Sequence, residues 1–116
     1  MKFDTSVGIT LDESLIKNYF RYLVDHFFKI LPMREQEEES LKTYMTGFLL
    51  EILGCQSLIP EFGTDAEFLK LASTLQYLID NPETSVRDVK RSVFGAISVC
   101  NHLKTKYLTK GVVSDE

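Results

Sequence analysis

The sequence predicts an all-α protein, an antiparallel bundle of about four helices over residues 11–31, 38–54, 65–81 and 85–108. Three observations support this prediction. Apolar residues recur at three- and four-residue spacing in each stretch, which is typical of a helix with one buried face. Each stretch opens near polar or acidic residues suited to a helix start, and each ends near glycine, proline or several lysines. A chain of 116 residues is expected to form one domain with a single core.

The first helix is predicted from its boundaries as well as from its period. Residues 1–9 show no periodicity, so we expect a short irregular arm. Thr10 and Glu13 have the spacing of a capping box, in which each side chain satisfies a free backbone N–H at the helix start. The helix should end at Leu31, because Pro32 has no backbone donor and disfavours helical geometry in the residue before it.

The second helix is predicted to follow the acidic run 35–39, whose carboxylates suit the positive end of a helix dipole. Gly54 is expected to end it, because glycine is the usual residue just past a helix. The connection 55–63 contains Pro60 and several apolar residues. We therefore expect it to pack back against the bundle.

The third and fourth helices are predicted to form an antiparallel hairpin. Thr64 and Glu67 repeat the capping-box spacing and start the third helix, which ends before Pro82. The turn that follows is short, so the next helix must run back antiparallel. This fourth helix should reach about residue 108, and a flexible tail is expected over 111–116.

The helix predicted over 11–31 carries more apolar surface than one buried face needs. Its apolar side chains cover well over half of its circumference when residues are placed about 100° apart. Two explanations are open. The helix lies centrally and contacts the other three, or part of its aromatic face is a docking surface, for which a homodimer is the natural form. The candidate interface residues are Tyr19, Tyr22, Val24 and Phe28.

Charge is distributed unevenly along the chain. Residues 1–84 carry 7 basic against 14 acidic side chains, whereas residues 85–111 carry 6 against 1. Helical geometry places several of these cations on the outer side of the last helix, where they would contact successive phosphates. The candidate anion or nucleic-acid face consists of Arg87, Lys90, Arg91, His102 and Lys104. The alternative is a solvated face that complements the acidic helices, and a pI near 5.2 is unusual for a nucleic-acid-binding domain.

Motifs for catalysis, metal binding or phosphate binding are missing from the sequence. The two histidines are too far apart for a ligand pair, and the glycines stand singly rather than in a phosphate loop. We therefore expect no enzymatic activity, no metal and no cofactor. No apolar run approaches the roughly 20 residues that span a bilayer, the N-terminus lacks a signal-peptide pattern, and two cysteines are too few for a disulfide framework. These features predict a cytoplasmic protein without a membrane partner.

Four short segments carry a resemblance to other sequences. Ile30–Pro32 closes an aromatic helix, Leu53–Cys55 lies at the predicted end of the second helix, and Leu75–Pro82 precedes a helix that contains Val89–Arg91. With these segments the chain resembles short uncharacterised proteins of Firmicutes and their mobile elements, from about residue 15 to residue 107. The resemblance implies an intracellular bacterial origin, and it implies no activity and no site.

Three functional hypotheses follow from the sequence. The leading hypothesis is a small helical interaction or adaptor module that acts through its surfaces, with a protein partner or a second copy of itself. The alternative is a nucleic-acid-associated accessory or regulatory protein that uses the basic face of the last helix. The third is a bundle that binds a small ligand among the aromatic residues of the first two helices.

Overall fold

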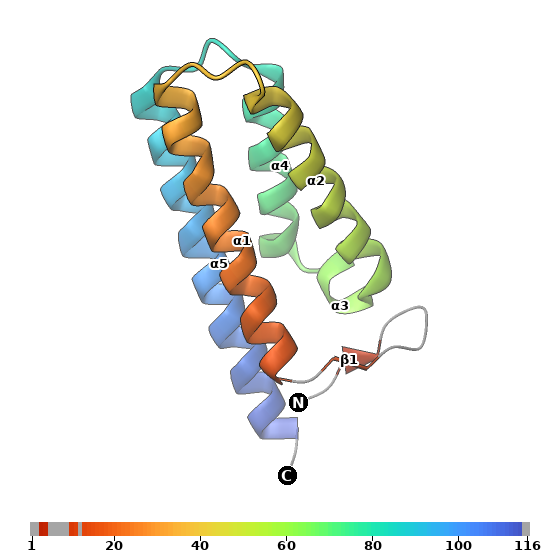
Figure 1. Cartoon of the computed structure of the whole chain (residues 1–116). Coiled ribbons are helices and arrows are strands. Elements are labelled where there is room, and N and C mark those ends of the chain that lie inside the picture. The colour runs from red at the N-terminus through yellow and green to blue at the C-terminus, as the bar shows by residue number, and fades with distance from the viewer. Residues whose placement is uncertain (1–2, 5–9, 12, 115–116) are drawn as a thin grey trace.

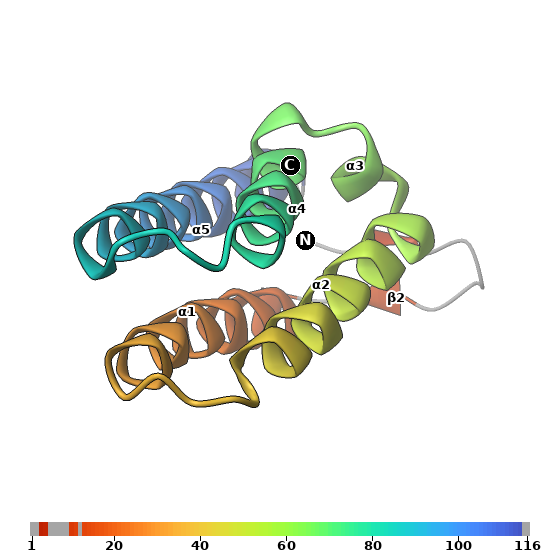
Figure 2. The same cartoon turned by 90° about the horizontal axis from the view of Figure 1, so that it is seen from above.

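The structure is a computed structural model that describes residues 3–4, 10–11 and 13–114. Four long helices form an antiparallel bundle (Figure 1), which confirms the predicted fold class. α1 packs along α5, α2 packs along α4, and α4 also contacts α5; Figure 2 shows this arrangement from above. The helices are α1 (Glu13–Glu35), α2 (Leu41–Leu58), the short α3 (Pro60–Gly63), α4 (Ala66–Asp80) and α5 (Val86–Ser114).

The described part of the predicted arm, residues 3–4, is a short strand rather than irregular chain. β1 (Phe3–Asp4) pairs antiparallel with β2 (Thr10–Leu11). Thr10 is paired with Asp4, so it does not cap α1, which begins at Glu13. The capping-box prediction at this position is wrong, because the strand pairing already engages the backbone that would have entered the helix. The arm's other residues, 1–2 and 5–9, lie outside the described residues.

α1 continues through Pro32 to Glu35, so the predicted end at Leu31 is wrong. The fixed φ of proline suits a helix, and in the last turn its missing N–H removes only one helical hydrogen bond. The helix stops in a Schellman arrangement. The N–H groups of Glu37 and of the next residue donate to carbonyls in the last turn of α1 at 3.1 and 3.0 Å. Glu37 has a φ of 52°, a left-handed conformation that glycine usually occupies.

α2 begins at Leu41 and ends at Leu58, so both of its predicted ends are displaced. The acidic residues at positions 37–39 lie in the turn before the helix instead of in its first turn. Gly54 lies inside the helix, where packing of the surrounding apolar residues outweighs the cost of glycine. The helix ends because Pro60 holds the residue before it extended, with φ −116° and ψ 103°.

Asp65, and not Thr64, caps α4. Its Oδ1 accepts from the backbone N–H groups of Glu67 at 2.9 Å and Phe68 at 3.3 Å. The Thr64 hydroxyl donates instead to the carbonyl of Pro60 at 3.2 Å. Aspartate and threonine are both good capping residues, so composition alone did not separate them.

α5 starts where it is predicted to start but runs further. The Ser85 hydroxyl accepts from the N–H of Asp88 at 3.2 Å, which is a helix cap. The helix then continues past residue 108 to Ser114, so most of the predicted tail is helical, and residues 115–116 lie outside the described part of the chain. None of the described helices has the length and apolarity to cross a membrane.

The core runs along the bundle axis and draws on every described helix. Aromatic rings from four helices meet in the half of the core next to α3. There Phe62 stacks on Phe68 at 4.6 Å between centroids and meets Tyr107 edge-on at 5.1 Å. Such ring contacts add to the burial of apolar area. The largest fully buried side chains are Phe20, Phe27, Phe62, Phe68, Ile16, Leu23, Ile30, Ile52, Leu71, Leu75, Leu103 and Val93.

Candidate interaction surface

An exposed aromatic pair lies on the outer side of the bundle where α1 and α5 pack together. Phe28 of α1 and Phe94 of α5 meet edge-on, with ring centroids 5.9 Å apart and an interplanar angle of 80°. The two residues remain 43% and 42% exposed. The contact joins the two helices, but it leaves a large part of both rings in solvent.

Three cations of α5 surround Phe94. Arg87, Lys90 and Arg91 are exposed and lie one or two turns before it in the helix. Helical geometry places all three within about 60° of Phe94 around the helix axis. The Lys90 ammonium lies 6.0 Å from the centroid of the Phe94 ring, at the outer limit of a cation–π contact.

α1 contributes a further cation on the same side. Arg21 is exposed and precedes Phe28 by seven residues, which places it about 20° away around the helix. Asp25 and Glu35 are exposed on nearby positions of α1, so positive charge is in the majority but is not unopposed. We define the α1–α5 face as Phe28, Phe94, Arg21, Arg87, Lys90 and Arg91.

The other predicted interface residues are used within the bundle. Tyr19 and Val24 are half-buried and pack against the core, so they are not available as interface residues. Tyr19 stacks on Phe62 at 6.0 Å, and burial together with the neighbouring Cys55 raises the pKa of its hydroxyl. Tyr22 is 40% exposed, but its hydroxyl donates to Glu51 of α2 at 2.5 Å. Of the predicted set, Phe28 is the residue whose ring joins the α1–α5 face.

The predicted basic face of the last helix is divided in two. Arg87, Lys90 and Arg91 remain together beside Phe94. His102 lies toward α4, where its Nδ1 is 2.5 Å from the carboxylate of Glu67, and Lys104 is half-buried. His102 and Lys104 are thus partly engaged within the bundle, and the phosphate-contacting role of the five residues stays a prediction.

Phe94 was missing from the residues predicted from the sequence. The signal was its position about 100° from Val93, just beyond the edge of the apolar stripe of α5. An aromatic residue at such an edge is covered or exposed according to its neighbouring helix, which the sequence of α5 alone does not contain.

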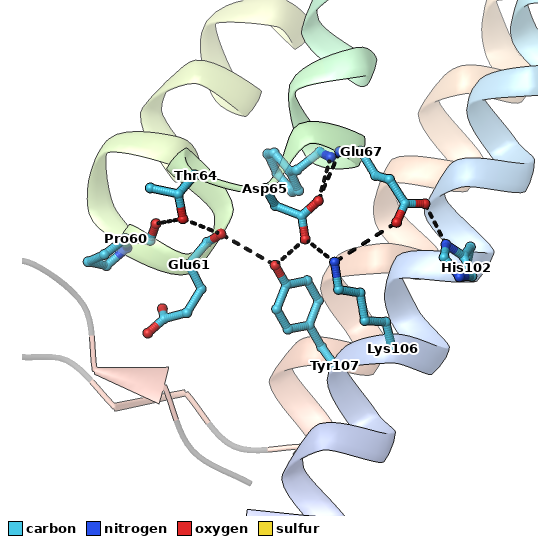
Figure 3. A network of polar contacts seen from close by, with 9 residues as sticks. Pro60, Glu61, Thr64, Asp65, Glu67, His102, Lys106 and Tyr107 are labelled. Carbon is cyan, nitrogen blue, oxygen red and sulfur yellow. Dashed lines mark hydrogen bonds and ion pairs between the residues drawn. The ribbon is translucent and has the colours of Figure 1, made fainter.

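A buried carboxylate joins α5 to the corner between α3 and α4 (Figure 3). Asp65 is 8% exposed, and its Oδ2 accepts from Lys106 Nζ at 2.8 Å and from the Tyr107 hydroxyl at 2.6 Å. Its Oδ1 is occupied by the two N–H groups of the α4 cap. Burial opposes ionisation of Asp65, but the hydrogen bonds from Lys106, Tyr107 and the backbone outweigh it and lower the pKa to about 2.

This network has a structural role. A carboxylate has about four lone-pair sites, and four donors already occupy those of Asp65. Burial and the charge of Asp65 both raise the pKa of Tyr107. The tyrosine therefore stays protonated and donates a hydrogen bond to the carboxylate. Neither group is poised to exchange a proton with a substrate near neutral pH.

A cavity of about 380 Å³ lies at the opposite end of the bundle, between the α1–α2 and α4–α5 turns. Its walls include the apolar side chains of Ile30, Met45 and Leu78. Arg34 lies at this cavity, and its guanidinium donates to the carbonyl of Thr84 at 2.9 Å, so it ties the two turns together. None of its lining residues is aromatic, whereas the sequence had placed a ligand pocket among the aromatic residues of the first two helices.

Groups of three or more histidine, cysteine or acidic side chains able to hold a metal are absent from the residues that the structure describes. Both cysteines are free thiols. Burial raises the pKa of Cys100 to about 12 and also raises the pKa of Cys55, so neither is an activated nucleophile near neutral pH.

Comparison of the chain with protein-family models, with curated proteins and with solved structures gave no match.

Proposed function

We propose that this protein is a small helical interaction module that docks an acidic protein segment on the α1–α5 face. The observation that carries the proposal is the exposed Phe28–Phe94 pair, because it lies among cations. Aromatic residues and arginines are the side chains that most often dominate binding energy at protein interfaces. Here both kinds occur together on one surface made by two rigid helices.

The size of the pair is sufficient for an anchor. Each ring exposes roughly 80 Å² when two-fifths of an aromatic side chain is open, and covering that area stabilises a complex by about 2 kcal/mol per ring. A third helix laid along α1 and α5 would cover both rings at once. Amphipathic helices bind helical surfaces in this way through apolar residues spaced three and four apart.

The cations of the α1–α5 face favour a partner with acidic side chains. Arg21, Arg87, Lys90 and Arg91 surround the rings, whereas the chain as a whole has a net charge of −4. An acidic segment is attracted to this face and repelled by most of the remaining surface, so the cations determine orientation and speed of association. We place the protein in the cytoplasm, where the free thiols of Cys55 and Cys100 stay reduced.

A nuclear magnetic resonance titration tests the proposal. The probes are a short amphipathic peptide with leucines on one side and glutamates on the other, and the same peptide with lysines in place of the glutamates. The glutamate peptide should shift the amide signals of Arg21, Phe28 and residues 87–94, and the lysine peptide should not. Phe28→Ser with Phe94→Ser should weaken binding at least about tenfold.

Tyr77→Ser is the matched control, because Tyr77 is an exposed aromatic residue on α4 and should leave binding unchanged. Arg87→Ala with Arg91→Ala should weaken binding mainly at low salt. The proposal would be overturned if the amide signals that shift belonged to another surface, or if the glutamate and lysine peptides bound equally well. The same titration is carried out with single-stranded and with duplex DNA. Preferential binding of DNA with a steep salt dependence would replace the acidic peptide with nucleic acid as the partner.

A further inference from the structure

The outward side of α2 carries apolar side chains that the bundle does not cover. Leu50 is 63% exposed, which is the highest value among the large apolar residues that the structure describes. Leu53 and Leu58 lie toward the two edges of this side, about 60° and 80° from Leu50, and are 43% and 42% exposed. Leu50 points away from the core residues of α2, so packing within the chain does not account for it.

Two glycines lie among these leucines. Gly47 and Gly54 are seven residues apart, which returns to nearly the same side of a helix. A Cβ added at either glycine would meet nothing within 4 Å, so no close contact inside the chain requires them. Glycine inside a helix costs stability relative to alanine. Their position does allow the backbone of another helix to approach α2 closely.

The same surface is free of charged side chains. We define the α2 outer face as Thr43, Thr46, Gly47, Leu50, Leu53, Gly54, Ser57 and Leu58. The charged residues of α2 are Lys42 and Glu51, and helical geometry places them at opposite edges of this face. The Glu51 carboxylate accepts a hydrogen bond from the hydroxyl of Tyr22 and is therefore held toward α1.

The absence of charge on the α2 outer face indicates which kind of partner it can bind. A twofold interface brings the same surface patch of two copies together, so a patch with one predominant charge faces that same charge. The α1–α5 face, with its majority of cations, is therefore unsuited to pairing with itself. The α2 outer face has no charge to oppose and presents leucines between glycines, which a second α2 helix can match.

We infer that two copies of this chain associate through their α2 outer faces, with the helices antiparallel and crossing near Leu50. In this arrangement Gly47 of one copy lies opposite Gly54 of the partner subunit, and the leucines pack beside the crossing point. A helix of 18 residues is about 27 Å long and about 10 Å wide. The buried area is thus only about a third of the roughly 800 Å² per partner of a standard interface, so the dimer is weak and forms at high concentration.

Sedimentation equilibrium of the full chain over a wide concentration range tests this inference. The mass should rise from monomer toward dimer with increasing concentration. Leu50→Glu should keep the protein monomeric without unfolding it, because the residue is exposed. Phe28→Glu, on the α1–α5 face, should leave the dimer unchanged. The inference is independent of the proposed function, since Leu50→Glu should also leave binding of the acidic peptide intact.

The glycines provide a second test in which two measurements move in opposite directions. Gly47→Ala with Gly54→Ala should raise the thermal midpoint of the dilute monomer by several degrees. The same substitutions should weaken the dimer at least about tenfold, because the methyl groups keep the helices apart. Gly95→Ala is the matched control, an open glycine in α5 that should raise the midpoint without changing the dimer. A monomer at every concentration, or a dimer that the paired alanines strengthen, would overturn the inference.

Discussion

Replacing Asp65 with asparagine tests how the corner between α3 and α4 is held against α5. The amide keeps an oxygen that can cap α4. However, it puts an NH₂ group where Oδ2 accepts from Lys106 Nζ at 2.8 Å and from the Tyr107 hydroxyl at 2.6 Å. Asparagine and aspartate have nearly the same shape, so packing around this buried position is preserved. Any loss of stability then reports on the charge and its two side-chain donors.

The expected magnitude follows from the pKa of Asp65. Its value of about 2, against an ordinary value of 3.8, corresponds to about 2 kcal/mol of stability near neutral pH. Because the pKa is lowered in the folded state, this contribution is complete above about pH 5. It is lost as the pH falls through the folded pKa, and about half is gone by pH 3. We therefore expect Asp65→Asn to lower the free energy of unfolding by about 2–3 kcal/mol at pH 7.

Urea denaturation followed by circular dichroism measures this difference. The gap between the wild type and Asp65→Asn should narrow by about 1 kcal/mol between pH 6 and pH 3, since asparagine does not titrate. Glu67→Gln is the matched control. Its carboxylate faces His102 and Lys106 at the exposed edge of the same network and should cost no more than about 0.5 kcal/mol. An unchanged free energy of unfolding in Asp65→Asn at pH 7, or a gap that is the same at both pH values, would refute this account.

Two further predictions concern backbone conformation and are checked by the same denaturation measurements. Glu37→Gly should raise the free energy of unfolding by about 0.5–1 kcal/mol, because Glu37 occupies a left-handed conformation with φ 52°; a loss of stability would contradict this reading. Gly63→Ala should be destabilising, because its Cβ would lie 2.9 Å from the carbonyl oxygen of Gln56. Gly95→Ala should instead stabilise by about 0.5–1 kcal/mol, since nothing lies within 4 Å. If the two alanine substitutions changed the free energy of unfolding equally, local contacts would not decide whether such a substitution stabilises the protein.

Helix ends show where local signals competed. Pro32 predicted the end of α1, and Gly54 predicted the end of α2, yet both residues lie inside their helices. Each carries a moderate local cost that continued packing of the helix outweighs. Pro60 did end α2, because a proline restricts the residue before it and the chain must turn there. Which proline or glycine ends a helix is therefore decided by the packing of the whole bundle.

The sequence by itself determined the helical fold and the buried side of each helix. Core positions such as Phe20, Leu75 and Val93 follow directly from apolar spacing, because a helix repeats every 3.6 residues whatever surrounds it. The cap of α5 at Ser85 was equally local. These features depend on residues within one or two turns of each other, so they are visible in the chain.

Only the tertiary structure decided which residues at the stripe edges are covered. Tyr19 and Phe28 both lie in the wide apolar arc of α1, but the first stacks on Phe62 and the second is 43% exposed beside Phe94. Their difference depends on which helix lies next to each edge. The order of helices around a bundle is not encoded in the period of any one of them, so the α1–α5 face emerged from packing alone.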